Sequence, residues 1–260
     1  MRVVVTGAAG DLGWRVGREL TRRGHTVVPA SRRTGVDLAT GDGLDAVLSG
    51  ADAVVHCATN PRRARAVDVE GTRRITTALA RQDDPAHLVA ISIVGCDLVP
   101  FGYYRAKADA ERLIETSAIP ATVVRATQFH ALAAFLARVT QVGRMGITLR
   151  DLTLRPVDIG WVASRLVDHA VGPRPTGPER AVDLVGPDIL SIPELAAAVA
   201  AHDDRPTTRF VRVPPVGRAM RGLSAGALIS AGEVERGGRS FSEWLATQPH
   251  PLPRGMHDRS

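Results

Sequence analysis

Hydrophobic residues in the first 140 positions form short runs that alternate with amphipathic stretches. Val3–Val5 is a β-branched run that stops at Thr6-Gly7, which predicts a buried strand. Leu12, Val16 and Leu20 then recur at helical spacing up to Gly24, which ends the predicted helix. By the same criteria we expect strands at 25–30, 53–56, 88–92 and 121–125, and helices at 44–48, 62–81, 104–116 and 128–139. This alternation predicts an α/β fold, a doubly wound parallel sheet with helices on both faces.

The pattern loosens after about residue 140, where most of the prolines lie. Here we expect helices at 157–171 and 192–201 and strands at 181–185 and 207–213. We interpret 1–248 as one domain, with a cofactor half at about 1–140. A small C-terminal substrate lobe at about 141–248 would pack over the carboxyl edge of the sheet, where such folds bind ligands. Residues 249–260, rich in Pro, His and Gly, are expected to form a disordered tail.

Glycines spaced G-x-x-G-x-x-G, Gly7, Gly10 and Gly13, link the first strand to the first helix. In that setting the first glycine permits the tight turn, the second lets the backbone approach a pyrophosphate, and the third allows close helix packing. The helix N-terminus favours the bound anion. We therefore predict a Rossmann fold whose dinucleotide contacts include Gly7, Ala9, Gly10, Asp11, Leu12 and Gly13.

The end of the second strand reads Ser31-Arg32-Arg33. Sites for NAD usually place an acid there to hold the ribose 2′-hydroxyl, whereas NADP sites omit the acid and supply arginine for the 2′-phosphate. Ser31 occupies the position of the acid, and Arg32 and Arg33 follow it. The cofactor predicted from these residues is NADP (NADPH).

Tyr103 and Lys107 form a Tyr-x-x-x-Lys pattern on one face of a predicted helix. The ammonium could favour the phenolate of Tyr103, which would then exchange a proton with a substrate carbonyl or hydroxyl. Lys107 is the single lysine among 33 basic residues, and Tyr103 is one of two tyrosines. A compact ammonium and a planar guanidinium are not interchangeable, so one lysine in an arginine-rich chain indicates a site that needs the ammonium.

With these motifs the chain resembles the extended or atypical short-chain dehydrogenase/reductases, above all their NmrA-like, NAD(P)H-binding branch. The resemblance covers nearly the whole chain and is most specific over 1–130. It implies that Lys107 binds the nicotinamide ribose and that Asp37 and Leu38 contact the adenine. It also implies that the small residues after the third strand, Cys57, Ala58 and Thr59, pass close to the cofactor.

Three positions depart from the family pattern. The family places a serine after the fourth strand to bind the substrate oxygen; Ser92 is available, but extended members often carry the hydroxyl one residue later, where Ile93 stands. Asp68 replaces the asparagine of a family N-V-x-G-T motif, and Ala126 replaces a proline after the fifth strand. We list Thr127 and Gln128, with Phe129, as candidates for the nicotinamide wall or, equally, for helix capping and core packing.

The bulk composition excludes several other classes of protein. The net charge is +6, but the arginines are spread among acids and aromatics are 4% of residues, so we expect no nucleic-acid partner. The apolar runs are too short for a membrane span or a signal peptide. Cys57 and Cys96 form no CxxC pair, and His56 fits a structural hydrogen bond, so we expect a cytoplasmic protein without metal.

The function predicted first is an NADPH-dependent reductase acting on a small carbonyl or quinone-type acceptor, with Tyr103 as proton donor, Lys107 as its electrostatic partner and Ser92 as the third catalytic candidate. A second hypothesis is a non-catalytic NADP(H)-binding redox sensor that acts through a partner. A sugar-nucleotide epimerase or dehydratase is the third. The sequence identifies neither the substrate nor the oligomeric state.

Overall fold

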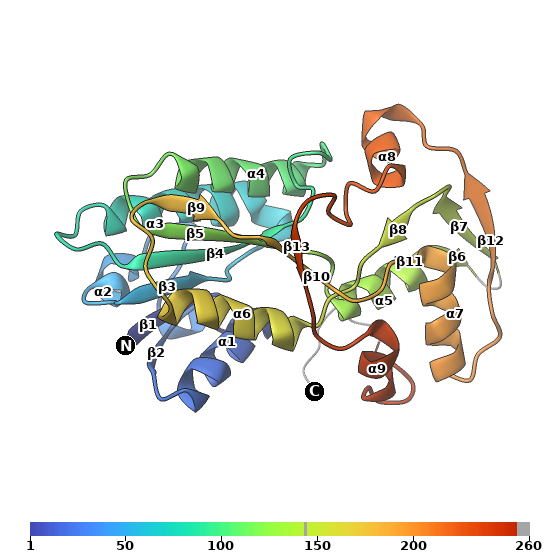
Figure 1. Ribbon diagram of the computed structural model, residues 1–260, viewed down its shortest axis with the longest axis horizontal. Helices are drawn as coiled ribbons and strands as arrows, with labels where there is room; N and C mark the ends of the chain where they lie inside the picture. The colour runs from blue at the N-terminus through green and yellow to red at the C-terminus, as the bar shows by residue number, and fades with distance from the viewer. Residues whose placement is uncertain (143–144, 254–260) are drawn as a thin grey trace. The chain divides into compact units, whose positions relative to one another are not determined.

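The computed structural model describes residues 1–142 and 145–253, and these cluster into two compact units (Figure 1). Unit 1 comprises Met1–Asp97, Phe101–Arg125 and Val162–Val182, and unit 2 comprises Leu98–Pro100, Ala126–Trp161 and the residues from Asp183 onward. The helix that follows residue 158 therefore lies mostly in unit 1, whereas the sequence placed it in the C-terminal lobe. The division into a cofactor half and a substrate lobe stays a prediction.

Unit 1 is built on a parallel sheet in the order β5-β4-β3-β1-β2, with β9 on the outer side of β5. The pairs β1–β2, β1–β3, β3–β4 and β5–β9 are parallel. The strands are β1 (Arg2–Thr6), β2 (Thr26–Ala30), β3 (Ala53–His56), β4 (His87–Ile93), β5 (Ala121–Ala126) and β9 (Pro178–Arg180). Because the chain adds β2 on one side of β1 and β3 on the other, the order reverses between β1 and β3. In open α/β sheets, ligands bind at the carboxyl ends of the strands at such a point.

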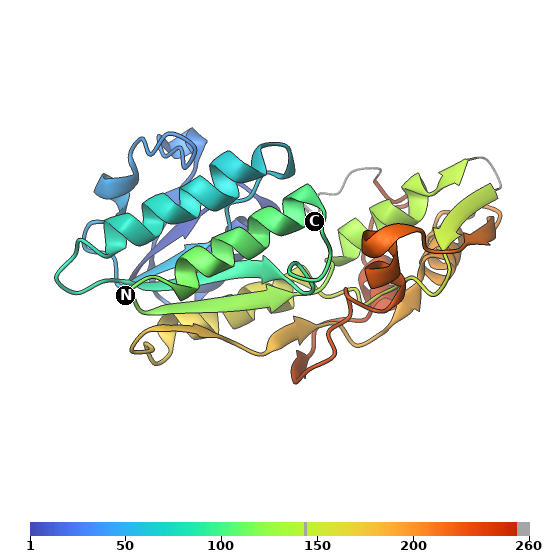
Figure 2. The same cartoon turned by 90° about the horizontal axis from the view of Figure 1, so that it is seen from above.

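Helices cover both faces of this sheet, α3 and α4 on one side and α1 and α6 on the other (Figure 1). They are α1 (Asp11–Arg22), α2 (Leu44–Leu48), α3 (Glu70–Leu79), α4 (Gly102–Glu115) and α6 (Ile159–Val171), with short turns η1 (Arg32–Thr34), η2 (Pro61–Arg63) and η3 (Arg65–Val69). Seen from above, α3 and α4 run side by side (Figure 2). The doubly wound Rossmann-like α/β fold predicted from the alternation of elements is confirmed.

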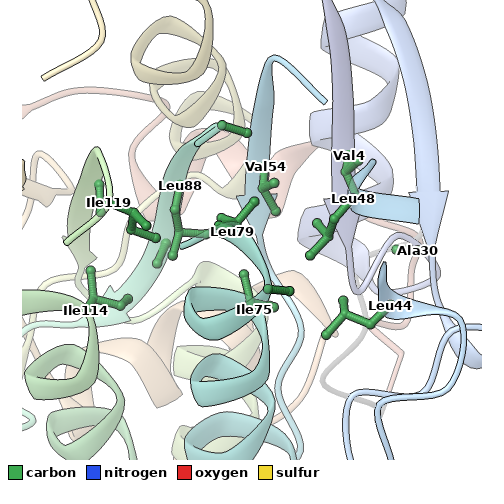
Figure 3. Packing of buried hydrophobic residues seen from close by; sticks show 14 of the residues in the cluster. Val4, Ala30, Leu44, Leu48, Val54, Ile75, Leu79, Leu88, Ile114 and Ile119 are labelled. Carbon is green, nitrogen blue, oxygen red and sulfur yellow. The ribbon is translucent and has the colours of Figure 1, made fainter. Parts of the chain in front are cut away.

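The core under α3 and α4 consists of aliphatic side chains from strands and helices (Figure 3). Ile75 and Leu79 of α3 and Leu88 of β4 are fully buried in it, together with Val54 of β3. The helical repeat of Ile75 and Leu79 and the strand position of Leu88 bring these residues to one interface. The expected continuous helix 62–81 is instead divided into η2, the π-helical turn η3 and α3.

Unit 2 combines short strands with four helices among its described residues. The helices are α5 (His130–Val139), α7 (Ile192–His202), α8 (Gly217–Ser224) and α9 (Phe241–Ala246). The strands are β6 (Gln141–Val142), β7 (Met145–Leu149), β8 (Thr153–Leu154), β10 (Asp183–Val185), β11 (Leu190–Ser191), β12 (Arg209–Val213) and β13 (Val234–Arg236). Helix α7 begins as predicted: the Ser191 hydroxyl accepts from the Glu194 N–H, and the Glu194 carboxylate accepts from the Ser191 N–H. Strands of two or three residues carry no periodicity, so most of this unit was not predicted.

Part of the expected tail is anchored in unit 2. Leu252 is buried, and its N–H donates to Asp203 Oδ1 at 2.8 Å. Arg138 donates to the carbonyl oxygens of Leu252 and Pro253 at 3.0 and 2.8 Å. These bonds satisfy the backbone of the segment before residue 254, whereas the rest of the expected disordered tail, 254–260, lies outside the described residues.

Replacing Leu88 by alanine should lower the free energy of unfolding by about 2–5 kcal/mol, because the fully buried side chain leaves a cavity between β4 and α3. The matched control is Leu98→Ala, the same chemical change at a side chain that is 61% exposed, which should cost less than about 0.5 kcal/mol. Denaturant unfolding of both variants measures the difference, and equal losses would contradict the assigned core.

Candidate functional site

The glycine turn is pressed against the end of β3. Gly7 has φ +67°, and a Cβ atom there would lie 2.7 Å from both Cα and N of Ala58. At Gly13 a Cβ would lie 2.4 Å from the Gly7 carbonyl oxygen. Both positions therefore require glycine, since backbone atoms cannot give way as a flexible side chain does. The turn and the end of β3 form one rigid surface.

Gly10 differs from the other two glycines because one side of it is open. The nearest atom to a Cβ added there is the Gly7 carbonyl oxygen at 3.2 Å, and the residue is exposed. No side chain caps α1, whose N-cap is Gly10. Ala9 beside it is also exposed, Asp11 lies in the first turn of the helix, and Leu12 turns into the core. The arrangement leaves room for an anionic group such as a phosphate at the start of α1.

Two exposed arginines follow β2. Ser31 begins η1, and its N–H donates to the Thr34 hydroxyl at 2.9 Å. Arg32 and Arg33 are exposed, and neither guanidinium forms a hydrogen bond or ion pair with the part of the chain that the structure describes. Their donors are therefore available to an anion outside the protein.

Asp37 and Leu38 continue this loop. The Asp37 carboxylate accepts from the Ala39 N–H at 2.8 Å, which fixes the loop locally. Leu38 is buried in the core, and its carbonyl accepts from Arg74 Nη1 at 3.1 Å. The proposed adenine contacts thus belong to a loop that is held in place by its own hydrogen bonds.

The Tyr103 phenol lies at the head of a hydrogen-bonded chain. Tyr103 Oη is 2.8 Å from Thr59 Oγ1, and the Thr59 hydroxyl donates to Asp68 Oδ1 at 2.6 Å. Because the Thr59 hydroxyl donates its one proton to the carboxylate, it can only accept a hydrogen bond from Tyr103. The chain is therefore directed from the phenol through Thr59 to Asp68.

Asp68 also holds the single lysine. Lys107 Nζ lies 3.0 Å from Asp68 Oδ1, and the two side chains are 9% and 1% exposed. Burial acts to lower the pKa of Lys107, but attraction to Tyr103 and Asp68 outweighs it and the pKa is raised, so the ammonium stays charged. Asp68 additionally accepts from the Asn60 N–H at 3.2 Å. Asp68 therefore joins Thr59, at the end of β3, to Lys107 on α4.

The sequence identified Tyr103, Lys107 and Thr59 but assigned no role to Asp68. The available signal was the substitution of aspartate for the asparagine of the family motif. Sequence spacing could not show that residue 68 meets residue 107, because the contact depends on the packing of η3 against α4. The same contact changes the expected electrostatics, since the charge of Lys107 is balanced by a carboxylate.

Ser92 lies in another cluster. Its Oγ is 3.8 Å from Cys96 Sγ, and the Cys96 thiol donates to Glu111 Oε1 at 3.3 Å. Glu111 in turn forms a buried ion pair with Arg125 at 2.6 Å. Among the described residues, the hydroxyl that contacts Tyr103 is that of Thr59 and not that of Ser92. The catalytic role of Ser92 stays a prediction.

His56 and Cys57 are neutral parts of the site. Thr72 donates its hydroxyl proton to the Asp68 carbonyl oxygen, so it accepts from His56 Nε2, and His56 Nδ1 accepts from Thr6 Oγ1 at 2.7 Å. Burial, aided by Lys107, lowers the pKa of His56 to about 4. Burial raises the pKa of the Cys57 thiol to about 12. The expected structural histidine is thus held in one tautomer at the end of β3.

Thr127 and Gln128 lie in unit 2. Gln128 is buried, donates from Nε2 to the Leu228 carbonyl oxygen at 3.1 Å and accepts at Oε1 from the Arg155 N–H at 3.2 Å. Both ends of its amide therefore serve the backbone, which is the structural role weighed above. Thr127 is buried, and its Oγ1 has no hydrogen-bond partner in the described part of the chain.

Arg155 is a buried cation in unit 2. It is 5% exposed, and its Nε donates to the Gly186 carbonyl oxygen at 2.9 Å. Within the described ranges its guanidinium has no carboxylate partner. Burial, and then the nearby Arg236, lower its pKa. Arg155 is therefore a buried cation that no carboxylate of the described residues pairs with.

The described residues form neither a metal site nor a membrane-spanning helix. No group of three or more His, Cys, Asp or Glu side chains in 1–142 and 145–253 is arranged to hold a metal ion. In the same ranges, every helix is too short or too polar to cross a membrane.

Sequence similarity to known proteins is found in the first part of the chain. Residues 1–93 match the family described as RmlD substrate binding domain. Uncharacterized proteins of Mycobacterium bovis and Mycobacterium tuberculosis are 31% identical over 91 residues, which is 31% of this chain and 11% of each relative. The match therefore spans about a tenth of the length of these curated relatives.

Solved structures share the fold over most of the chain. The NADPH-dependent quinone oxidoreductase QOR2 from Escherichia coli, complexed with NADPH, aligns with a TM-score of 0.73 and 14% identity over 94% of this chain and 98% of that one. MoeE5 in complex with UDP-glucose and NAD gives 0.67 and 21% over 95% and 97%. A nucleoside-diphosphate-sugar epimerase from Staphylococcus aureus gives 0.69 and 18% over 94% and 99%. The resemblance to the atypical and extended short-chain dehydrogenase/reductases is confirmed in fold.

The buried histidines of unit 1 predict acid sensitivity. The pKa values of His56 and His87 are lowered from 6.5 to about 4, in both cases mainly by burial. Between these values the unfolded chain binds protons that the folded chain does not, so the free energy of unfolding falls as pH falls below 6.5. Each histidine should contribute a slope of up to about 1.4 kcal/mol per pH unit.

Denaturant unfolding between pH 7 and about pH 5 measures this slope, above the range in which most carboxylates titrate. His56→Gln should remove the contribution of His56 to the slope and leave the contribution of His87. The double variant with His87→Gln should remove both contributions. A slope that is unchanged in a folded His56→Gln variant would contradict the assignment of His56 as a buried neutral side chain.

Proposed function

We propose that this protein is an NADP(H)-dependent oxidoreductase that reduces a small carbonyl or quinone-type acceptor. The observation that carries the proposal is the joining of Tyr103, Thr59, Asp68 and Lys107 at the end of β3, against the glycine turn. A phenol beside a buried ammonium is suited to proton transfer, and the glycine turn beside it is suited to a dinucleotide.

The residues of unit 1 fit a nicotinamide dinucleotide. Gly10 offers an open backbone at the start of α1, and Gly7 and Gly13 hold the turn close to β3. Arg32 and Arg33 present exposed guanidiniums, which pair with no described residue, where an NAD site would carry an acid, and this supports NADP. Similar structures have been solved with NADPH or with NAD, so the choice between the two depends on these arginines.

Each residue of the site would have a separate role in the reduction. The bound cofactor would supply a hydride to the carbonyl carbon. Tyr103 would give the proton of its hydroxyl to the carbonyl oxygen, where charge develops. Lys107 would hold the ribose of the nicotinamide and favour the phenolate left on Tyr103. Thr59 and Asp68 would keep Tyr103 and Lys107 in place.

Two other functions remain as second candidates. A non-catalytic NADP(H) sensor is favoured by the position of Ser92, whose hydroxyl contacts Cys96 and not Tyr103. Sugar-nucleotide chemistry is favoured by Arg155, a buried cation that would suit the phosphates of such a substrate. The sensor would bind cofactor without turnover, and the epimerase would retain its cofactor through purification.

Arg32→Ala should weaken NADPH binding about 10–100-fold and leave NADH binding within about twofold, because the lost contact is a charge-assisted bond to the 2′-phosphate. Arg63→Ala is the matched control, an exposed arginine of unit 1 whose removal should change neither affinity. Calorimetric titration with each dinucleotide measures the effect. Equal losses for NADPH and NADH would remove Arg32 from the phosphate site.

Tyr103→Phe should lower acceptor-dependent NADPH oxidation at least about 100-fold, because general acid catalysis contributes factors of that size, and should leave NADPH affinity within about threefold. Tyr104→Phe removes the other phenol of the chain and should keep most of the activity. Absorbance at the nicotinamide band with a panel of quinones and aldehydes measures turnover. Full activity of Tyr103→Phe would contradict the catalytic assignment, and binding without turnover in the parent would favour the sensor.

A further inference from the structure

We propose that Asp68 is a positioning residue that opposes the ionisation of Tyr103. By holding both Lys107 and Thr59, it would disfavour the phenolate relative to a site with asparagine at this position. This inference rests on the proposed function, because a proton held on Tyr103 matters only if the residue donates it. The balance of charge and the direction of the hydrogen bonds carry the argument.

The first part of the argument is the charge balance. An ammonium alone beside a phenol favours the phenolate, which is the form that accepts a proton from an alcohol. Here Asp68 lies 3.0 Å from Lys107 Nζ, and both side chains are almost fully buried. The pair is neutral as a whole, so Lys107 pulls less on the Tyr103 proton than an unpaired ammonium would. With asparagine at position 68, as in the family motif, the pull would remain.

The second part is the direction of the hydrogen bonds. Thr59 donates to the Asp68 carboxylate at 2.6 Å, which leaves only its lone pairs for Tyr103 Oη at 2.8 Å. This geometry accepts the proton of a neutral phenol and offers no donor to a phenolate. Charge balance and hydrogen bonding therefore favour the same form of Tyr103, the protonated one.

The reaction that follows is balanced in protons and electrons. The carbonyl carbon of the acceptor takes a hydride, with its electron pair, from the reduced cofactor, and the carbonyl oxygen takes the proton of Tyr103. The products are the alcohol, the oxidised cofactor and the phenolate, which regains a proton from solvent water.

The other ionisable groups around Tyr103 lie on α4 and at the end of β3. On α4 these are Lys107, whose pKa is raised, despite burial, by attraction to Tyr103 and Asp68, and Tyr104, whose pKa is raised by burial to about 12. At the end of β3 they are His56, with a pKa of about 4, and Cys57, with a pKa of about 12. Asp68 is the acid that faces the phenol, through Thr59.

The sequence makes a direct test possible, because the chain has only two tyrosines. In a Tyr104→Phe background, the ultraviolet absorbance of phenolate reports Tyr103 alone and needs neither cofactor nor substrate. Asp68→Asn should move the midpoint of this titration down by about one pH unit or more, because it frees the charge of Lys107. Lys107→Met should move the midpoint up, because it leaves the carboxylate.

The matched control is Asp109→Asn, which removes an exposed acid on the same helix that pairs with Arg112. Solvent screens that charge, so the midpoint should move by less than about 0.3 pH unit. Shifts of opposite sign in Asp68→Asn and Lys107→Met are a signature that a purely structural role would not produce. An Asp68→Asn midpoint that is unchanged or higher would overturn the proposal.

Thr59→Val tests the direction of the hydrogen bonds and keeps the ion pair of Asp68 and Lys107. It therefore tests the proposal even if Asp68→Asn does not fold. Loss of the acceptor should lower the Tyr103 midpoint, whereas a higher or unchanged midpoint would refute the directed chain. Calorimetry with NADPH and an acceptor assay on the same proteins separate the two claims. Midpoints that shift as expected without any turnover would refute the proposed function and keep the role of Asp68.

Discussion

The buried ion pair of Asp68 and Lys107 is the interaction on which the candidate site depends. Removing two charges from water costs several kcal/mol for each ion, and their attraction alone does not assure a net gain. The Asp68 carboxylate offsets this cost by accepting two further hydrogen bonds, from the Thr59 hydroxyl and the Asn60 N–H. Three segments, the loop after β3, η3 and α4, are thereby fixed to one carboxylate. Two apolar side chains in place of Asp68 and Lys107 could pack equally well, but they would not hold the Tyr103 phenol in one orientation.

A second constraint, steric rather than electrostatic, fixes the position of this carboxylate relative to the glycine turn. Gly7 packs on Ala58, and the next residue, Thr59, is the one that Asp68 binds. Neither contact tolerates displacement, since one joins backbone atoms and the other is a short charged hydrogen bond. The start of α1 and the head of α4 are therefore coupled through two consecutive residues of one loop. A change at Gly7 would disturb Tyr103 without touching it.

The extent to which this could be predicted differs between the parts of the chain. β1, α1 and β3 follow from β-branched runs, a helical repeat and glycine punctuation, all of which are local in sequence. Tyr103 and Lys107 follow from spacing on one helix. The contact between Asp68 and Lys107 joins residues 39 positions apart, and no local pattern encodes it. The same holds for the contact between Thr59 and Tyr103, and for the short strands of unit 2.

The use of one lysine in a chain rich in arginine now has a physical reason beyond the ribose. Arg125, the other buried cation of unit 1 that pairs with an acid, binds Glu111 through two nitrogens of its planar fork, Nε at 3.0 and 3.1 Å and Nη2 at 2.6 Å. A fork of that kind at position 107 would engage both oxygens of Asp68 and compete with Thr59 for them. The ammonium makes a single contact with Asp68 Oδ1 and leaves the carboxylate able to accept from Thr59 and Asn60. A compact charge is thus required by the protein side of the site, independently of the ribose contact proposed for Lys107.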